Sequence, residues 1–491
     1  MKKSPKKCRS QAAFKILSGK GRTVIVAVDF AKRSMKVQAF LDSETTAWKR
    51  GLDVENSQAG VDFLLGKLDG ILRKWRVSRD RVVFGGEDPG SYAIPFIEAV
   101  KRSGYLFVAV NAKAASENRD NTRASSDLLD LYGIAETIRR KHVRDIEAAS
   151  GIYAELHRAS RARSQATKQE RQVSNQIHRI VDLVFPGLLN DKATGMQPLS
   201  AASLVLLESG LTPARLRKMK DATVIGLLRK GGAIHREEIV ARLRNLADRI
   251  LPPPCDLEHL LEVLRCKVAV LRAIRDEIVC EEKQMARCLA QTPCAWMLTL
   301  PGIGVSLVGS FAAELGDPDR WRSVAQVFSY AGCAQRHKQT GGPDQEGYGL
   351  GLPWDCNHRL KFVLLQMAYH AGTTPHPVQR MAGLGGEHRL MQHYRKVEAR
   401  GGKSLLSTAR LLLRIVFQMM RDETPYHVKP AEGENSATKE ERIARMNATT
   451  ETAIAKLERY GLAGIPDETN RIHAFRKFNK EYAEAITAIN L

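Results

Sequence analysis

The chain has 491 residues, of which 43% are hydrophobic, so it carries enough apolar material for two or three folded domains, and wholesale disorder is excluded. Its 76 Lys and Arg outnumber 54 Asp and Glu, which gives a formal net charge of +22. Because a compact chain with such an excess repels itself unless a polyanion neutralises it, nucleic acid is the first partner to consider; a merely basic protein is the alternative.

Cysteine spacing and hydropathy exclude further classes of protein. Eight cysteines are scattered without a C-x-x-C pair, which argues against a zinc ribbon and against a disulfide framework. No run of about eighteen apolar residues occurs, so no membrane span is expected. The basic amino-terminal residues lack the apolar stretch of a signal peptide, and we therefore expect a cytoplasmic protein.

The first part of the chain predicts alternating strands and helices. Residues 1–20 predict a flexible basic arm, and the apolar run 24–28 predicts a strand buried on both faces that ends on Asp29. Residues 35–41 suit a hairpin partner for that strand. Apolar spacing marks further helices at 60–75 and 94–103 and further strands at 81–84 and 105–110. This alternation predicts an α/β domain over residues 21–140.

Long helices are predicted for residues 141–293. Apolar residues at helical spacing lead up to a Pro-Gly pair at 186–187, and short helical pieces follow until the triple-proline break at 252–254. From 257 to 278, apolar residues recur at steps of four and three, as in a coiled-coil seam. We expect the two long helices to fold back on each other as an antiparallel pair.

Four acidic residues stand where one site could use them. Glu87, like Asp29, follows a predicted strand, and Asp127 and Asp130 share one face at the start of a predicted helix. Four converging carboxylates would repel one another unless cations lay between them. Two Mg²⁺ ions about 3.5–4 Å apart, with Mn²⁺ as a substitute, would relieve that repulsion and serve phosphodiester chemistry. The alternative is that Asp29 only caps its strand and that Asp127 and Asp130 only favour the dipole of their helix.

The order of these acids carries a resemblance to a known family. The segments VAVDFAK, VVFGGEDPGSY and SSDLLDL resemble the DEDD catalytic domain of the insertion-sequence one-ten family of transposases, whose fold is RuvC-like and RNase H-like. The resemblance spans roughly residues 22–185 and resumes over 294–420. It implies that the divalent-metal ligands are Asp29, Glu87, Asp127 and Asp130.

Two departures from the family pattern leave these ligands in place. Family members usually read Glu-x-Thr-Gly where this chain has Glu-Asp-Pro-Gly at 87–90. They usually carry a Lys-Thr pair before the second motif, where this chain has Ser125-Ser126. Neither change removes a carboxylate.

A compact helical domain is expected over residues 294–425. Its Pro-Gly-Ile-Gly segment at 301–304 resembles a helix-hairpin-helix turn, in which Gly302 and Gly304 would let backbone N–H groups approach a phosphate. An ordinary tight turn between packed helices is the alternative. The segments that follow resemble the second transposase domain of the same family. A polar helical tail is expected over 426–491.

The resemblance also implies a nucleophile. The family's Gln-Ser-Gly serine is the proposed nucleophile on DNA, and this chain has Thr340 at that position. A threonine hydroxyl has the same chemistry, but its β-methyl group stiffens χ1 and crowds the path of attack. Thr340 is therefore an active nucleophile, a slower one or a relic, with Ser329 as a weaker alternative.

Basic residues in the same domain are candidates for contact with nucleic acid. Those near the nucleophile could hold the scissile phosphate, and later ones could contact the backbone; a solvated surface is the alternative for each. They are Arg336, Lys338, Arg359, Lys361, Arg395 and Lys403.

These patterns predict an α/β plus all-α protein with a long-helix coiled-coil insertion. The resemblance implies that the α/β domain is RNase H-like (RuvC-like) and that the helical domain is a transposase domain with a helix-hairpin-helix-like turn. The function implied is a DNA transposase or recombinase acting on element ends and target DNA. The resemblance further implies a guide (bridge) RNA, and we expect a homo-oligomer, a dimer or a tetramer. Two rivals stay open: a metal-dependent RuvC-like junction nuclease, and a catalytically silent nucleic-acid-binding relic.

Overall fold

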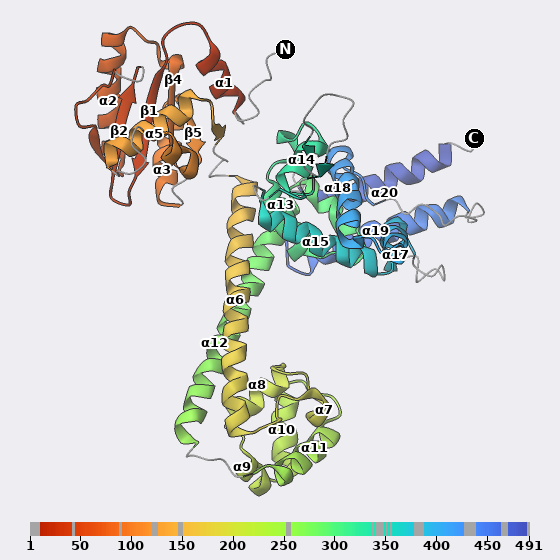
Figure 1. Ribbon diagram of the computed structural model, residues 1–491. Helices are drawn as coiled ribbons and strands as arrows, with labels where there is room; N and C mark the ends of the chain where they lie inside the picture. Colours follow the sequence, from red (N-terminus) through yellow and green to blue (C-terminus); the bar gives the residue numbers. More distant parts are fainter. Residues whose placement is uncertain are drawn as a thin grey trace. The chain divides into compact units, whose positions relative to one another are not determined.

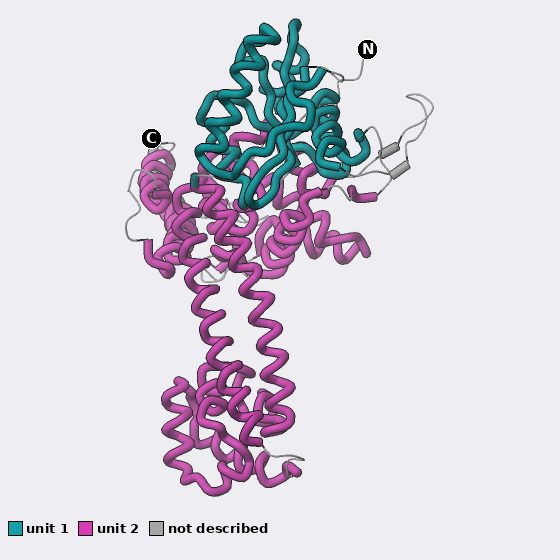
Figure 2. The backbone as a smooth tube through the Cα atoms, turned by 90° about the vertical axis from the view of Figure 1, so that its left-hand side faces the viewer, with its two compact units in different colours: residues 1–151 teal, residues 152–491 magenta. Residues whose placement is uncertain are grey.

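The computed structural model forms two units, residues 1–151 and residues 152–491, which are coloured separately in Figure 2 and described separately here. The structure describes residues 10–41, 45–87, 91–119, 126–145, 151–251, 257–334, 337–338, 348–349, 351–353, 356–377, 387–426, 438–462 and 470–488.

A mixed six-stranded sheet forms the centre of the first unit (Figure 1). Its order is β3-β2-β1-β4-β5-β6. The first three strands pair antiparallel, β4 and β5 continue parallel to β1, and β6 pairs antiparallel with β5. The expected hairpin partner of the first strand is confirmed as β2. The bounds are β1 Val24–Phe30, β2 Ser34–Phe40, β3 Leu52–Glu55, β4 Val82–Glu87, β5 Leu106–Val110 and β6 Val143–Asp145.

Helices cover both faces of this sheet. On one face, alternate residues of β1, such as Val26, join a core with α2 (Gln58–Trp75) and α3 (Ile94–Arg102). On the other face, Ile25 and Ala27 join a core with α5 (Asp127–Arg139). The short helix α4 (Ala112–Glu117) follows β5. Burial on both faces explains why β1 is a continuous apolar run.

The expectation of a flexible arm over residues 1–20 is wrong for its second half. Gln11–Ser18 forms helix α1, whose N-cap Ser10 accepts a hydrogen bond from the Ala13 N–H. Ala13 is buried against the sheet. Arg81 donates to the Ile16 carbonyl at 2.7 Å and so holds the end of the helix. A basic side chain from another part of the fold therefore orders the arm.

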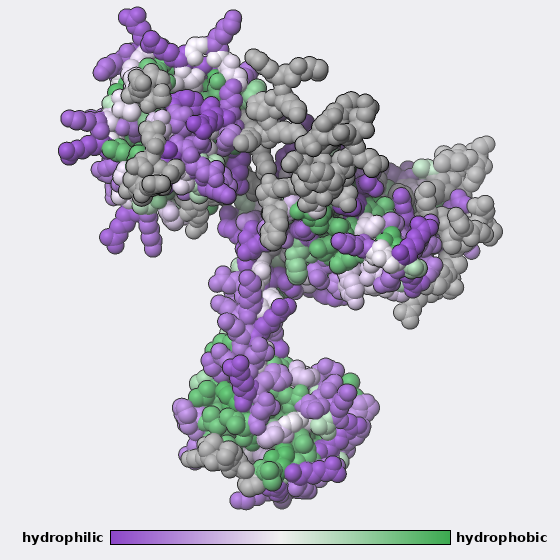
Figure 3. All heavy atoms as spheres, viewed as in Figure 1, coloured by the Kyte–Doolittle hydropathy of each residue, from purple (hydrophilic) through white to green (hydrophobic). Residues whose placement is uncertain are grey.

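In the second unit, two long helices lie side by side (Figures 1 and 2). The antiparallel direction follows from their contacts: the start of α6 (Ile152–Val184) shares a core with the end of α12 (Glu258–Leu289), and ion pairs bridge them farther along. These pairs are Arg163–Glu282 at 2.7 Å and Arg275–Glu170 at 2.9 Å. The predicted pairing is confirmed. Figure 3 shows hydrophilic side chains over the middle of this pair.

Short helices fill the interval between the long ones, as the sequence predicts. They pack with the far halves of α6 and α12 around a second core that includes Ile177, Leu206 and Leu243. Seam residues of α12, among them Leu264 and Leu271, are buried in this same core. The helices are α7 Asp191–Thr194, α8 Ala201–Glu208, α9 Pro213–Lys218, α10 Asp221–Lys230 and α11 Arg236–Arg249.

The remaining helices build a core around Trp296, Phe311 and Phe475, all almost fully buried. The tail helix α20 takes part in it, since the Trp296 and Phe475 rings meet edge to face at 4.2 Å between centroids. No helix in the described part of the chain is long and apolar enough to cross a membrane. The helices are η3 Pro293–Thr299, α13 Val305–Leu315, η4 Pro318–Arg320, α14 Val324–Tyr330, α15 His358–Thr373, α17 Arg389–Ala399, α18 Ser404–Asp422, α19 Lys439–Glu458 and α20 Arg471–Ala488.

Gly85 in β4 gives a test of how closely α5 must approach the sheet. A Cβ at this position would lie 2.5 Å from Ile138 Cδ1 of α5. Gly85→Ala is therefore expected to destabilise the first unit by about 1–3 kcal/mol, measured as faster hydrogen exchange of β4 amides. The control is Gly66→Ala in α2, where no described atom lies within 4 Å of the new Cβ, and which should stabilise by up to about 1 kcal/mol. Equal effects of the two changes would contradict the close contact.

Candidate active site

Asp29 and Glu87 lie next to each other at the carboxyl ends of two parallel strands. In the register of β1 and β4, Val28 stands opposite Gly86, so the following residues of both strands are the two acids. Asp29 continues the alternation of Ile25 and Ala27, which face α5. Glu87 likewise continues the face of Gly85, which meets α5. Both acids therefore belong to the α5 side of the sheet.

Helix α5 brings the other two acids to this side. Ser126 is its N-cap, and the Ser126 hydroxyl accepts a hydrogen bond from the Leu129 N–H at 3.4 Å. Asp127 and Asp130 stand in the first turn, where the helix dipole favours negative charge. Asp127 is exposed, whereas Asp130 is partly buried.

The four carboxylates are close enough to act on one another electrostatically. Burial is the largest cause of a raised pKa at Asp29, and three nearby carboxylates add to it: Asp130, Asp127 and Glu87. Burial also raises the pKa of Glu87, with Asp130 as the next cause. The sequence-predicted acids therefore share one electrostatic environment, in which the charged forms of Asp29 and Glu87 are disfavoured.

Arg119 is a member of this cluster that the sequence pattern does not reveal. Its Nη2 lies 2.6 Å from Asp130 Oδ1, and its side chain is only 18% exposed. The guanidinium also lowers the pKa of both Asp29 and Glu87, opposing the carboxylates. Arg119 follows α4 in a segment without a recognisable motif, and only the folded chain brings it to Asp130.

The donor set fits a hard divalent cation, since carboxylate oxygens are the ligands that Mg²⁺ and Mn²⁺ prefer. Lys36 stands opposite Asp29 on the neighbouring strand. It does not neutralise the acidic cluster, because its ammonium binds Asp53 at 2.8 Å. Within the described residues, no group of three or more acidic, histidine or cysteine side chains is drawn together closely enough to hold a metal ion as it stands. In this arrangement, the Arg119–Asp130 ion pair directs one of the four carboxylates towards a cation of the protein itself.

The candidate residues of the second domain divide into described and undescribed ones. Thr340 and Arg336 lie outside the described residues. Lys338 is described only by its backbone, which pairs with Tyr348 in a short ribbon of two strands, β7 (His337–Lys338) and β8 (Tyr348–Gly349). Ser329 is exposed on α14.

The basic candidates differ in what holds them. Arg359 is exposed in the first turn of α15, and Lys361, two residues later, is partly buried. Arg395 on α17 forms an ion pair with Glu387. Lys403 is exposed at the start of α18. These positions are compatible with a nucleic-acid contact and with a solvated surface.

A buried polar network beside these residues was not predicted. Asn357 caps α15 and its Nδ2 donates to Glu314 at 2.9 Å and to the Tyr330 hydroxyl at 3.0 Å. Glu314, 6% exposed, also binds Arg161 of α6 at 2.9 Å. A buried carboxylate needs such partners. The network therefore fixes the start of α15 against α13 and the long helix α6.

Comparison with known proteins identifies the class. A family model for the DEDD transposase domain of IS110, described as a transposase, matches residues 26–186 and thus contains all four acids. A second model, described as Transposase IS116/IS110/IS902 family, matches residues 294–380. The mixed sheet, the acids at its edge and these two matches define a transposase, an enzyme that cleaves and rejoins DNA.

The chain belongs to the IS110 family of transposases, which is the insertion-sequence one-ten family. The two matched ranges together take in just over half of the chain. A relative from Streptomyces coelicolor, named "Insertion element IS110 uncharacterized 43.6 kDa protein", is 25% identical over 319 residues, which covers 63% of this chain and 74% of the relative. DNA is therefore a partner of this protein.

Removing one charge from the cluster should stabilise the metal-free protein. Because the pKa of Asp29 is raised above its ordinary 3.8, the unfolded chain loses this proton first as the pH rises, and stability falls through that window. Asp29→Asn is expected to raise the unfolding midpoint of the first unit by roughly 2–4 °C near neutral pH, which is about 1 kcal/mol, and not at pH well below 3.8. The measurement is calorimetry in EDTA.

The matched control for this change is Asp53→Asn, which removes a carboxylate that binds Lys36 outside the cluster. It should leave the midpoint unchanged or lower it. An Asp29→Asn protein that is less stable than wild type near neutral pH would contradict the repulsion.

Arg119→Met should strengthen the binding of a divalent cation. The substitution keeps an apolar stem but removes the charge that competes for Asp130, so the affinity for Mn²⁺ should rise about threefold to tenfold. Electron paramagnetic resonance of free Mn²⁺ during titration measures it directly. Arg79→Met, which removes an arginine paired with Asp69 in the same unit, is the control and should bind as wild type does. Weaker binding by Arg119→Met would instead assign Arg119 the task of orienting Asp130.

Proposed function

We propose that this transposase cleaves DNA with Asp29, Glu87, Asp127 and Asp130 as ligands of two Mg²⁺ ions, for which Mn²⁺ can substitute. The observation that carries the proposal is the placement of Asp29 and Glu87 at adjacent parallel strand ends, on the side of the sheet that α5 covers. The raised pKa values of Asp29 and Glu87, caused by burial first and by neighbouring carboxylates second, support it further. When bound, such a pair of ions polarises the scissile phosphodiester and stabilises the leaving oxygen.

The protein's own residues divide the work of the site. Strands β1 and β4 hold two carboxylates rigidly at the edge of the sheet, and the first turn of α5 supplies the other two. Arg119 balances their charge in the metal-free protein. We infer an RNase H-like (RuvC-like) fold for this domain, which is supported by its mixed sheet and by the family match.

The Thr340 hydroxyl is the proposed nucleophile. Its oxygen attacks the phosphorus of the scissile bond and displaces one deoxyribose oxygen, which leaves with a proton; one phosphodiester bond breaks and one forms. Attack by the hydroxyl of another strand reverses the step, so that strands are rejoined and the threonine is released. The resemblance of the 294–380 domain to the family supports this assignment.

Phosphate contacts are assigned to the second domain. The turn at Gly302 and Gly304 leads into the amino terminus of α13, where backbone N–H groups favour an anion. The basic residues complete the surface: Arg336, Lys338, Arg359, Lys361, Arg395 and Lys403. We further propose a guide RNA, supported by the family and by the net charge of +22.

A homo-oligomer, dimer or tetramer, is proposed because the two catalytic domains have to meet over one phosphodiester and can do so across subunits. The apolar seam of α12, the proposed coiled coil, does not supply the interface, since Leu264, Val268 and Leu271 are buried within the chain. Assembly therefore has to use other surfaces.

The test is a covalent-adduct assay with Mg²⁺, labelled element-end DNA and its flanking RNA, read on denaturing gels. Wild type should form a DNA adduct that Thr340→Ala abolishes and Thr340→Ser retains or increases, because serine lacks the crowding methyl group. Asp29→Ala should lose at least about a hundredfold in rate. Asp53→Ala, an acid of the same sheet outside the cluster, is the control.

Other outcomes select the rivals. Nicking without an adduct, lost in Asp29→Ala but unaffected by Thr340→Ala, would identify a junction nuclease. Salt-sensitive binding without any cleavage would identify a silent nucleic-acid-binding protein.

A further inference from the structure

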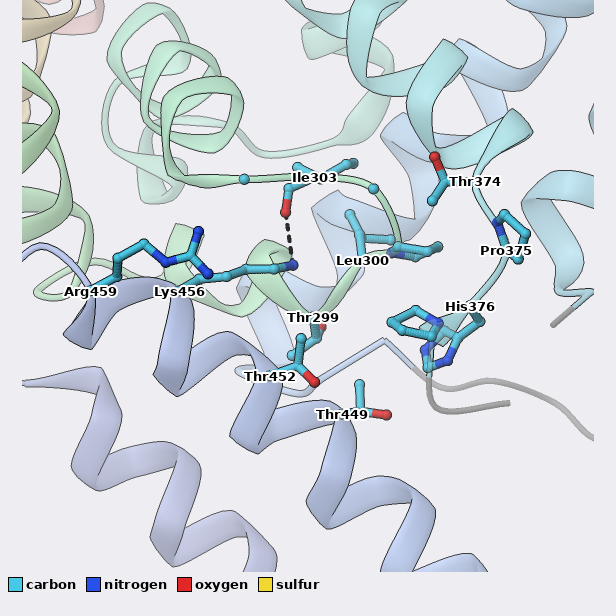
Figure 4. Close-up of a pocket in the computed structure, with 14 residues that line it drawn as sticks. Thr299, Leu300, Ile303, Thr374, Pro375, His376, Thr449, Thr452, Lys456 and Arg459 are labelled. Atoms are coloured by element: carbon cyan, nitrogen blue, oxygen red, sulfur yellow. Dashed lines mark hydrogen bonds between the residues drawn. The ribbon is translucent and has the colours of Figure 1, made fainter. Parts of the chain in front are cut away.

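A pocket of about 800 Å³ lies beside the Pro-Gly-Ile-Gly turn of the second unit (Figure 4). One wall is the turn itself, residues 299–304, and a second is the segment 374–377 after α15. The third wall is α19, which contributes two threonines, a lysine and an arginine. The volume lies in the range of sites that hold small organic ligands.

The turn is held in a conformation that glycine permits. Gly302 has φ +69°, and a Cβ there would lie 2.5 Å from the Thr374 hydroxyl oxygen. Gly304 is the N-cap of α13; no described atom lies within 4 Å of a Cβ built on it, and no described side chain caps the helix. The amino terminus of α13 therefore has open space beside its N-cap, at the edge of the pocket, and its first N–H groups are not capped by a described side chain.

Lys456 fastens this turn to the tail. Its ammonium donates to the Leu298 carbonyl at 2.6 Å and to the Ile303 carbonyl at 2.8 Å, the latter drawn in Figure 4. Burial lowers the pKa of Lys456 to about 8, with Arg459 as the lesser cause. The pocket thus has a cationic end made by a helix that lies beyond the family-matched range 294–380.

His376 gives the pocket an unsatisfied polar edge. The residue is 2% exposed, and neither ring nitrogen has a hydrogen-bond partner among the described residues. Figure 4 shows its ring on the side of the pocket away from Lys456 and Arg459. Burial is the main cause that lowers the pKa of His376 to about 4, so the ring is neutral and offers one donor and one acceptor. A buried polar group without a partner is costly, and a ligand that supplies both functions removes that cost.

We propose that this pocket receives one unpaired nucleobase of the strand that the transposase binds. The proposal rests on the proposed function and deepens it. A base matches the pocket in three respects: flat faces for the walls of Pro301, Pro375 and Pro377, an edge with donors and acceptors for His376, and a phosphate for the end with Arg459 and the α13 amino terminus. DNA and RNA strands carry this same chemistry, and the experiment separates them.

The experiment uses the full chain in EDTA, so that binding is measured without cleavage. The probes are fluorescein-labelled single strands of the element end, as DNA and as RNA of the same sequence, each with one abasic site moved along the strand. In wild type, an abasic site at one position should weaken binding about tenfold in the DNA or the RNA series. Fluorescence anisotropy gives the dissociation constants.

Two variants test the pocket by different routes. Thr452→Phe fills the pocket from α19, and His376→Phe keeps a ring of similar size but removes both nitrogens. Each should abolish the loss of affinity that an abasic site causes at one position. Ala455→Phe adds the same side chain to the exposed side of α19, and this variant should still show the position-specific loss of affinity. Thermal unfolding midpoints verify that each variant is folded.

The proposal is overturned if no abasic position matters in either series, or if the loss persists in both Thr452→Phe and His376→Phe. Adduct formation with Mg²⁺ is measured on the same preparations. A wild type that forms the adduct but shows no abasic effect refutes the pocket alone, whereas an abasic effect without any adduct or cleavage refutes the proposed function alone.

Discussion

The parallel pairing of β1 with β4 is the constraint on which the candidate active site depends. It sets Asp29 beside Glu87, and the alternation of side chains then points both towards α5. A shift of one residue in either strand would move its acid to the opposite face, among the apolar side chains that pack against α2 and α3. The buried core on both faces therefore does more than stabilise the domain. It also fixes where the carboxylates gather, although their negative charges repel one another.

A second constraint acts through the long helices. Because α12 buries its apolar seam against α6 and the short helices, the coiled-coil-like pattern is satisfied within one chain. The same α6 carries Arg161, which neutralises the buried Glu314 and, through Asn357, fixes the start of α15. The two long helices thus connect the core around the short helices α7 to α11 with the core that contains α13 and α15.

Local pattern predicted much of this structure from sequence. The helix Asp127–Arg139 begins where the sequence predicts it, because a serine N-cap and acids in the first turn act within a few residues. Contacts between distant residues were not predictable. The arm residues 11–18 are ordered by Arg81, and Arg119 reaches Asp130 only after α4 and α5 have packed. Neither arginine stands in a pattern that differs from any exposed basic position. The roles of the four acids and of Thr340 remain predictions.

A contact from the tail changes how the Pro-Gly-Ile-Gly motif is interpreted. Taken alone, Pro-Gly-Ile-Gly is compatible with a phosphate-binding turn and with an ordinary one. In the folded chain, Lys456 is partly buried, although burial of an ammonium group costs free energy. It donates hydrogen bonds to two carbonyl groups at this turn, those of Leu298 and Ile303, which lie more than 150 residues earlier in the sequence. A turn that only joined two helices would need no such support, since its carbonyls could face water. The support is needed if the shape of the turn has to be kept while a ligand enters beside it. His376, which has no hydrogen-bond partner among the described residues, lies in the opposite wall and is consistent with that requirement. Both the turn and His376 line the pocket that the tail completes.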